Sequence, residues 1–86
     1  MIGNEIFDIL WTYPIYPTSW GFRNFHKYAH ELVFEVDPQY SDKVFRINKK
    51  EDKYNVYITN KNSKNIIIEN IEEDELINTL DKLIFG

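Results

Sequence analysis

The chain contains no cysteine, so neither a disulfide framework nor a zinc ribbon can hold it together. Its three glycines, Gly3, Gly21 and Gly86, are isolated from one another, so no glycine-rich loop is present to cradle a phosphate. No serine lies in a Gly-x-Ser-x-Gly elbow, and a cysteine nucleophile is excluded by composition. From these absences we expect no catalytic residue, no cofactor and no enzymatic activity.

Long apolar runs are also missing. No stretch of about 18 consecutive apolar residues occurs, so we expect no segment that spans a bilayer. The stretch from Met1 to Trp11 carries Glu5 and Asp8 but no basic residue, which does not fit the n-region of a signal peptide. We therefore expect no export, and the lack of cysteine favours a cytoplasmic location.

Aromatic side chains are plentiful by comparison. The 86 residues include two Trp, six Tyr and six Phe. Each of these side chains brings a large buried area to a chain that is otherwise short of volume. A chain of this length buries roughly 60 to 65% of its unfolded surface and cannot divide that surface between two cores. We therefore expect a single domain over residues 1–86.

Charge is unevenly distributed along the chain, whose net charge is −4. Residues 1–42 carry six acidic and two basic residues, and residues 65–86 carry six acidic residues and one basic residue. Residues 43–64 carry seven basic and two acidic residues. The middle of the chain is therefore basic and both flanks are acidic, which bears on partners rather than on the fold.

The N-terminal half predicts a short helix and an aromatic loop. Asn4 is a suitable N-cap for a helix that runs to residue 12. Two prolines restrict residues 13–21, where we expect an ordered loop. Residues 22–30 are ambiguous, because their aromatic residues follow a helical spacing, whereas residues 31–36 alternate as a strand.

The second half predicts strands. Residues 44–48 and 53–59 read as a hairpin with a polar four-residue connection, because apolar and polar side chains alternate along the second of these stretches. Residues 66–68 are three consecutive isoleucines. This run is too apolar for an edge strand with water on both sides, so we expect it inside the sheet or under a helix.

An amphipathic helix is expected from Glu72 to Phe85. With Glu72 as the cap, Glu75 falls at the N3 position of a capping box, and Ile71 and Leu76 form a hydrophobic staple. An apolar face at helical spacing must cover the sheet. Its members are Leu76, Ile77, Leu80, Leu83 and Ile84. The fold class is therefore α+β: a three- to four-stranded antiparallel sheet, a C-terminal helix on one face and a short N-terminal helix.

A histidine pair is the first candidate for chemistry. His26 and His30 are four residues apart, and Glu31 follows directly, so on a helix both imidazoles would share one face and could share a metal. No third ligand is indicated, and two surface or packing histidines are the favoured interpretation. Glu31 and Glu35 alternate with apolar residues, which is typical of a strand with one wet face. We therefore assign no metal ligand.

The basic stretch, residues 43–64, is the second candidate. Its lysines, among them Lys49, Lys50 and Lys53, are interleaved with aromatic residues, as in sheets that bind single-stranded nucleic acid. The acidic chain as a whole lacks the usual electrostatic footprint of such proteins, and lysines also guard exposed strands against edge pairing. A sheet-based single-stranded nucleic-acid-binding module is therefore the alternative function.

The third candidate combines aromatic and acidic residues. The aromatic residues of the N-terminal loop either close one end of the core or form a binding patch, since interfaces favour Trp and Tyr. Acidic residues would steer this surface toward a basic partner. The predicted partner-binding residues are Trp11, Tyr13, Tyr16, Trp20, Glu72, Glu73 and Asp74.

Composition and charge thus favour a small acidic, non-enzymatic protein-binding domain. Its expected partner is a larger protein. One such partner is a nucleic-acid enzyme, in which the carboxylates of this chain would occupy the phosphate sites. An inhibitor, an immunity-type protein or a phage antidefence protein would work in this way. This assignment is an analogy from size and charge.

Overall fold

The computed structural model describes residues 1–60 and 65–86. Three α-helices, five strands and one 3₁₀ helix occur in these residues. In chain order they are α1 (Ile2–Leu10), α2 (Ile15–Trp20), β1 (Arg23–Lys27), β2 (Glu31–Glu35), β3 (Val44–Lys50), β4 (Lys53–Thr59), β5 (Ile66–Ile71), the 3₁₀ helix η1 (Glu73–Glu75) and α3 (Leu76–Phe85).

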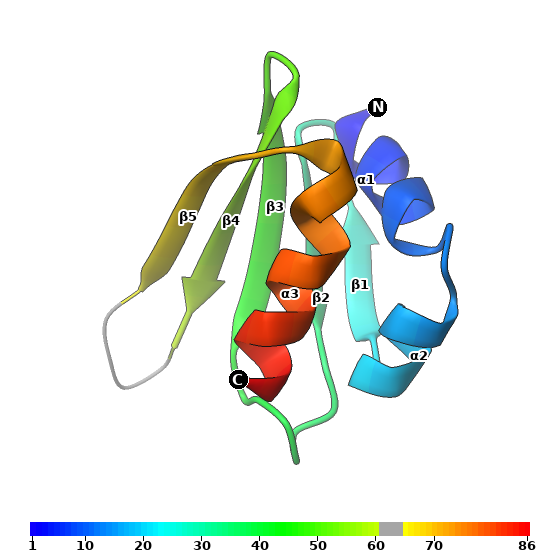
Figure 1. Ribbon diagram of the computed structural model, residues 1–86, viewed down its shortest axis with the longest axis vertical. Helices are drawn as coiled ribbons and strands as arrows, with labels where there is room; N and C mark the ends of the chain where they lie inside the picture. The colour runs from blue at the N-terminus through cyan, green and yellow to red at the C-terminus, as the bar shows by residue number, and fades with distance from the viewer. Residues whose placement is uncertain (61–64) are drawn as a thin grey trace.

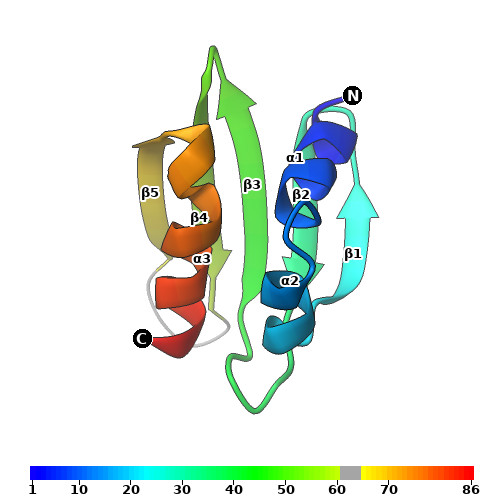
Figure 2. The same cartoon turned by 45° about the vertical axis from the view of Figure 1, so that its right-hand side comes forward.

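The strands form an antiparallel meander in the order β1-β2-β3-β4-β5. All three α-helices lie on one face of this sheet (Figures 1 and 2). The pair α1 and α2 covers the β1–β2 side, α3 covers the β4–β5 side, and β3 runs between them. The α+β class, the short N-terminal helix and the C-terminal helix are confirmed, whereas the expected number of strands is too small.

Strand β1 accounts for the difference in strand number. A bulge at Asn24, whose φ is 51°, shifts the register between Arg23 and His26. Because a bulge inserts one extra residue, Phe22 and Phe25 lie on the same side of the sheet, with their ring centroids 5.3 Å apart. A spacing of three residues, which resembles a helix in the sequence, is here a property of a bulged strand.

Helix α2 replaces part of the expected N-terminal loop. Pro14 is its N-cap residue and Pro17 lies in its first turn, where a missing backbone N–H costs nothing. Gly21 ends the helix with a φ of 69°, a left-handed conformation that glycine adopts readily. The prolines therefore start this helix, and the prediction of a loop throughout residues 13–21 is wrong.

The preceding helix, α1, begins at Ile2, so the prediction that Asn4 caps it is wrong.

The hairpin of β3 and β4 is confirmed with a shorter connection than expected. Lys50 is paired with Lys53, so the turn consists of Glu51 and Asp52 alone. Glu51 has a positive φ of 60°. The sequence also predicts a polar turn over residues 60–65, most of which, residues 61–64, lies outside the described residues.

Strand β5 is the outer strand beside β4, so of the two placements expected for residues 66–68 the one inside the sheet is wrong. The other, beneath a helix, agrees with the position of α3 over the β4–β5 side and with the packing of Ile68 against the core. The side chains of Ile66 and Ile67 are exposed, and Ile68 is partly buried. Strand order is decided by pairing between distant segments, which the local apolar pattern does not contain.

Helix α3 confirms the amphipathic pattern. Leu76, Leu80 and Ile84 are buried against the sheet. The expected capping box is absent, because no side-chain cap hydrogen bond forms and the acidic residues 73–75 make a 3₁₀ turn instead. The buried core includes side chains from all three α-helices and from the sheet. It contains Ile6, Leu10, Trp20, Leu32, Phe34, Val36, Phe45, Ile47, Tyr54, Val56, Ile58, Ile71, Leu76, Leu80 and Ile84.

Candidate protein-binding groove

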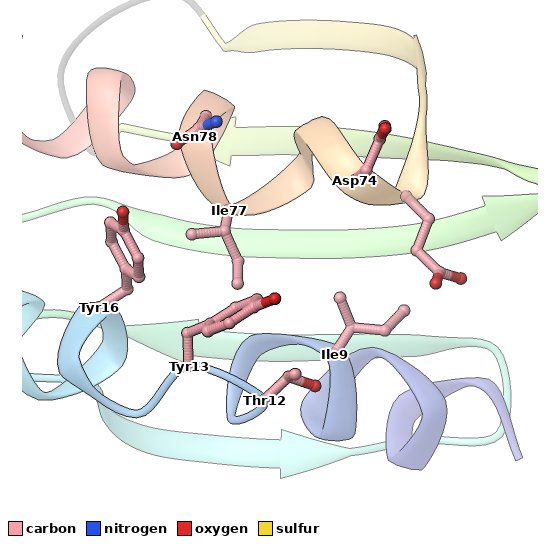
Figure 3. A pocket seen from close by; sticks show the side chains of 8 residues that line it. Ile9, Thr12, Tyr13, Tyr16, Asp74, Ile77 and Asn78 are labelled. Carbon is pink, nitrogen blue, oxygen red and sulfur yellow. The ribbon is translucent and has the colours of Figure 1, made fainter.

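A groove of about 440 Å³ lies between the α1–α2 unit on one side and η1 with α3 on the other (Figure 3). Its walls combine apolar, phenolic and acidic side chains. The eight residues that line it are Ile9, Thr12, Tyr13, Tyr16, Glu73, Asp74, Ile77 and Asn78. This volume falls within the range of pockets that take small ligands or several side chains of a partner.

The two walls are joined at one end. Trp20, at the end of α2, is fully buried, and its indole Nε1–H donates a hydrogen bond to Asp81 Oδ1 at 2.8 Å. Asp81 belongs to α3, so this bond fixes the distance between the two helical units. The groove opens beyond it, between the last turn of α1 and the first turns that follow β5.

The aromatic residues predicted to bind a partner are divided by the fold. Tyr13 and Tyr16 line the groove, and the side chain of Tyr13 is 62% exposed. Trp20 is fully buried in the core and does not line the groove, so it is not available to a partner. Trp11 packs against Phe7 and Phe22 on the β1 side, and it is not part of the groove lining.

The acidic residues are divided in the same way. Glu73 and Asp74 line the groove, whereas Glu72 forms an ion pair with Lys53. The hydroxyl of Tyr54 donates a hydrogen bond to Glu73 Oε1 at 3.2 Å. Burial, with this hydrogen bond as a second cause, raises the pKa of Tyr54 to about 12. The carboxylate of Glu73 is therefore anchored to the sheet, while Asp74 has no hydrogen-bond or ion-pair partner among residues 1–60 and 65–86.

Four residues that line the groove carry polar groups without a side-chain partner in the described part of the chain: the hydroxyls of Tyr13 and Tyr16, the carboxylate of Asp74 and the amide of Asn78. Figure 3 shows Tyr13 and Ile77 facing each other across the opening, with Ile9 beside them. Among residues 1–60 and 65–86, no lysine, arginine or histidine lines this groove. Its electrostatic complement is therefore a cation, next to an apolar group that fits between the helices.

Four lining residues were not among the predicted binding residues: Ile9, Thr12, Ile77 and Asn78. The amphipathic pattern places Ile77 on the apolar face of its helix, and Ile9 and Ile77 are both partly buried against the core. Their shared position depends on how α1 and α3 lie across the sheet. The sequence carries no local signal for that arrangement.

The three lysines of the alternative function lie around the β3–β4 turn, where Lys50 is directly opposite Lys53. Lys49 lies near α1, with its Nζ 3.5 Å from Glu5 Oε1, and Lys53 pairs with Glu72 beyond β5. The hydrogen bond that Lys53 donates to the carboxylate of Glu72 raises the pKa of Lys53. Lys50 is exposed beside the turn. Two of the three lysines are thus paired with carboxylates at different places.

The histidine pair does not have the helical geometry that a shared metal would need. His26 lies on β1, with its ring stacked on that of Tyr28 at 5.9 Å, and His30 lies in the turn before β2. Within the described residues, no three His, Cys, Asp or Glu side chains form a group that could hold a metal ion. Glu31 instead forms an ion pair with Arg46 at 3.2 Å.

No protein family model, curated protein or solved structure matches this chain. In residues 1–60 and 65–86, every helix is too short or too polar to cross a membrane.

Proposed function

We propose that this chain is a small acidic, non-enzymatic protein-binding domain, and that the groove between α1–α2 and α3 is its binding surface. The observation that carries the proposal is the lining of the groove. It joins apolar side chains, two phenols and two carboxylates, and the part of the chain that the structure describes places no cation among them. Surfaces with exposed tyrosines beside apolar side chains are typical of binding interfaces.

The partner expected for such a groove presents a basic side chain together with an apolar one. A lysine or arginine of the partner would face Asp74 and the phenolic rings of Tyr13 and Tyr16, where carboxylate and ring faces both attract a cation. An apolar side chain would contact Ile9 and Ile77. An inhibitor, an immunity-type protein or an antidefence protein would use such a surface to block a larger partner.

Asp74 provides the sharpest test of this function. Asp74→Lys reverses one charge at the groove, and no bond in the described structure is lost. Glu75→Lys is the matched control, because Glu75 is exposed in the same 3₁₀ turn but does not line the groove. Glu73→Lys is less suitable, since it removes the acceptor of the Tyr54 hydroxyl and thereby affects the fold.

The experiment is affinity capture from a lysate of the source cells or their host, using the wild-type chain and these two variants. We expect one stoichiometric protein on the wild type and on Glu75→Lys, and at least about tenfold weaker retention on Asp74→Lys, in line with the loss of a close charge pair. Equal retention on all three chains would contradict the groove as the binding surface.

A second matched pair tests the aromatic side of the groove. Tyr13→Ala removes a lining phenol, whereas Ile15→Ala truncates a side chain that is 74% exposed and outside the lining. We expect the first change to weaken capture and the second to leave it unchanged. Nucleic acid that co-purifies in place of a protein would favour the alternative function of residues 43–64.

A further inference from the structure

The outer strand β5 is apolar where edge strands are normally protected. Its first three residues are Ile66, Ile67 and Ile68, and Ile67 is 55% exposed. An edge strand presents a row of backbone N–H and C=O groups to solvent, and natural proteins block such rows with charges, prolines or bulges. None of these devices occurs between residues 66 and 68.

The opposite edge of the sheet shows the contrast. Strand β1 has Arg23 at its start, Lys27 at its end and a bulge at Asn24 between them. Both cations and the bulge are recognised means of preventing strand addition. Strand β5 has a charge and a bulge only at its far end, at Glu69 and Asn70, so among the described residues its isoleucine segment is the part of the two edges that carries neither device.

The residues on either side of the isoleucines determine how long the regular part of this edge is. Asn70 has a φ of 61° and lies at a second bulge, so a regular edge ends before it. Asn65 precedes β5 directly. The regular part of the edge thus covers residues 65–69, and its central residue is Ile67.

This segment is complementary to itself. In an antiparallel pair of two copies centred on Ile67, Ile66 of each chain lies opposite Ile68 of the other. Asn65 then lies opposite Glu69, an amide beside a carboxylate, so the one charged residue of the segment faces no like charge. We propose that β5 pairs antiparallel with β5 of a second copy of this chain, in the register that places Ile67 opposite Ile67.

The resulting dimer has a two-fold axis at Ile67 and one continuous sheet across both copies. On the face without helices, Ile67 is already paired with Tyr57 of β4. The second copy would cover the exposed side of Ile67 and continue that row. Each copy carries a net charge of −4, so we expect added salt to raise the dimer fraction by screening the repulsion.

Disulfide trapping tests the register directly, because the chain has no cysteine of its own. Directly opposed residues of antiparallel strands have Cα atoms about 4.5 to 5.5 Å apart, which suits a disulfide. Under mild oxidation we expect Ile67→Cys to form a covalent dimer roughly tenfold faster than Ile15→Cys, whose exposed site on α2 reports random collisions. Equal rates for the two variants would overturn the proposal.

A mixed pair of variants separates this register from others. Asn65→Cys and Glu69→Cys chains should cross-link with each other faster than either cross-links with itself. Faster self-linking of either variant would show a different register and overturn the proposed one.

Sedimentation velocity of the unmodified chain tests the equilibrium. We expect the sedimentation coefficient to rise with protein concentration for the wild type and for Ile15→Lys, and to stay at the monomer value for Ile67→Lys. Both variants exchange an exposed isoleucine for lysine, so they change net charge equally. A wild type that remains monomeric at all concentrations, or an Ile67→Lys chain that dimerises as strongly as the wild type, would overturn the proposal. The result of this test does not depend on whether the groove between α1–α2 and α3 binds a partner.

Discussion

Trp20 and Asp81 join the two helical units of this domain through one hydrogen bond. The indole Nε1–H donates to the carboxylate at 2.8 Å, from a side chain that is fully buried. Asp81→Leu would leave this N–H buried without its acceptor, so we expect a loss of about 1 to 3 kcal/mol in the free energy of unfolding. Chemical denaturation followed by tryptophan fluorescence measures this loss.

Asp81→Asn is the control for that prediction. The amide retains an oxygen that can accept the indole N–H, while the charge is lost as in the leucine variant. We expect its destabilisation to be clearly smaller than that of Asp81→Leu. Equal losses would show that the charge, and not the hydrogen bond to Trp20, supplies the stability.

Gly3 of α1 lies so close to the turn between β1 and β2 that a Cβ atom has no room. A built Cβ would lie 2.5 Å from the carbonyl oxygen of Tyr28 and 2.7 Å from that of Glu31. Both are backbone atoms, and the Gly3 N–H donates to that same oxygen of Tyr28 at 3.0 Å. We expect Gly3→Ala to destabilise the domain by about 1 to 3 kcal/mol, as overpacking does.

In an exposed helix the same change would stabilise by about 1 kcal/mol. Asn4→Ala provides this comparison, because Asn4 is the next residue of α1 and is exposed. We expect thermal unfolding to rank Asn4→Ala at or above the wild type and Gly3→Ala well below it. A Gly3→Ala variant as stable as the wild type would contradict the close approach of α1.

The parts of the fold that the sequence predicts well are those with a regular local period. The 3.6-residue spacing of Leu76, Leu80 and Ile84 identifies α3, and alternation along residues 53–59 identifies β4. Strand β1 was ambiguous because its bulge at Asn24 breaks the two-residue period on which such a prediction depends. The edge position of β5 follows from strand order, which no local period encodes.

The sequence predicts that the candidate site combines aromatic and acidic side chains. It does not predict which of these side chains line the groove. Tyr13, Tyr16, Glu73 and Asp74 were identified because aromatic and acidic residues are concentrated in two short segments. Trp20 belongs to the same aromatic segment but turns into the core, since α2 buries one side against α3. Residue type alone does not distinguish a tyrosine at the rim from a tryptophan beneath it.

The turn between β3 and β4 offers a stabilising substitution. Glu51 has a φ of 60°, a conformation that costs a non-glycine residue about 1 kcal/mol. We expect Glu51→Gly to raise the free energy of unfolding by about 0.5 to 1 kcal/mol. Asp52 does not have a positive φ, so Asp52→Gly should fail to stabilise. Urea denaturation of the two variants, with equal changes in charge, decides between them.

Asp37 gives the domain a stability that depends on pH in the acidic range. The backbone N–H of Gln39 donates to Asp37 Oδ1 at 3.0 Å, and Arg23 lies 3.3 Å from Oδ2. The hydrogen bond from Gln39, with the charge of Arg23 as a smaller cause, lowers the pKa of Asp37 below its usual 3.8. Because the folded pKa is lower than the unfolded one, this carboxylate stabilises the fold above the usual value, and the contribution is lost as pH falls through the folded pKa.

Asp37→Asn tests this relationship. We expect the variant to be less stable than the wild type at neutral pH, since the amide has no charge for Arg23 and offers one oxygen where the carboxylate has two. As pH falls below the usual 3.8 and through the folded pKa of Asp37, the two chains should converge, because the wild-type carboxylate becomes protonated. Urea denaturation at each pH measures the difference in the free energy of unfolding. A difference that stays constant from neutral to acidic pH would show that the substitution acts through packing and not through the charge of Asp37.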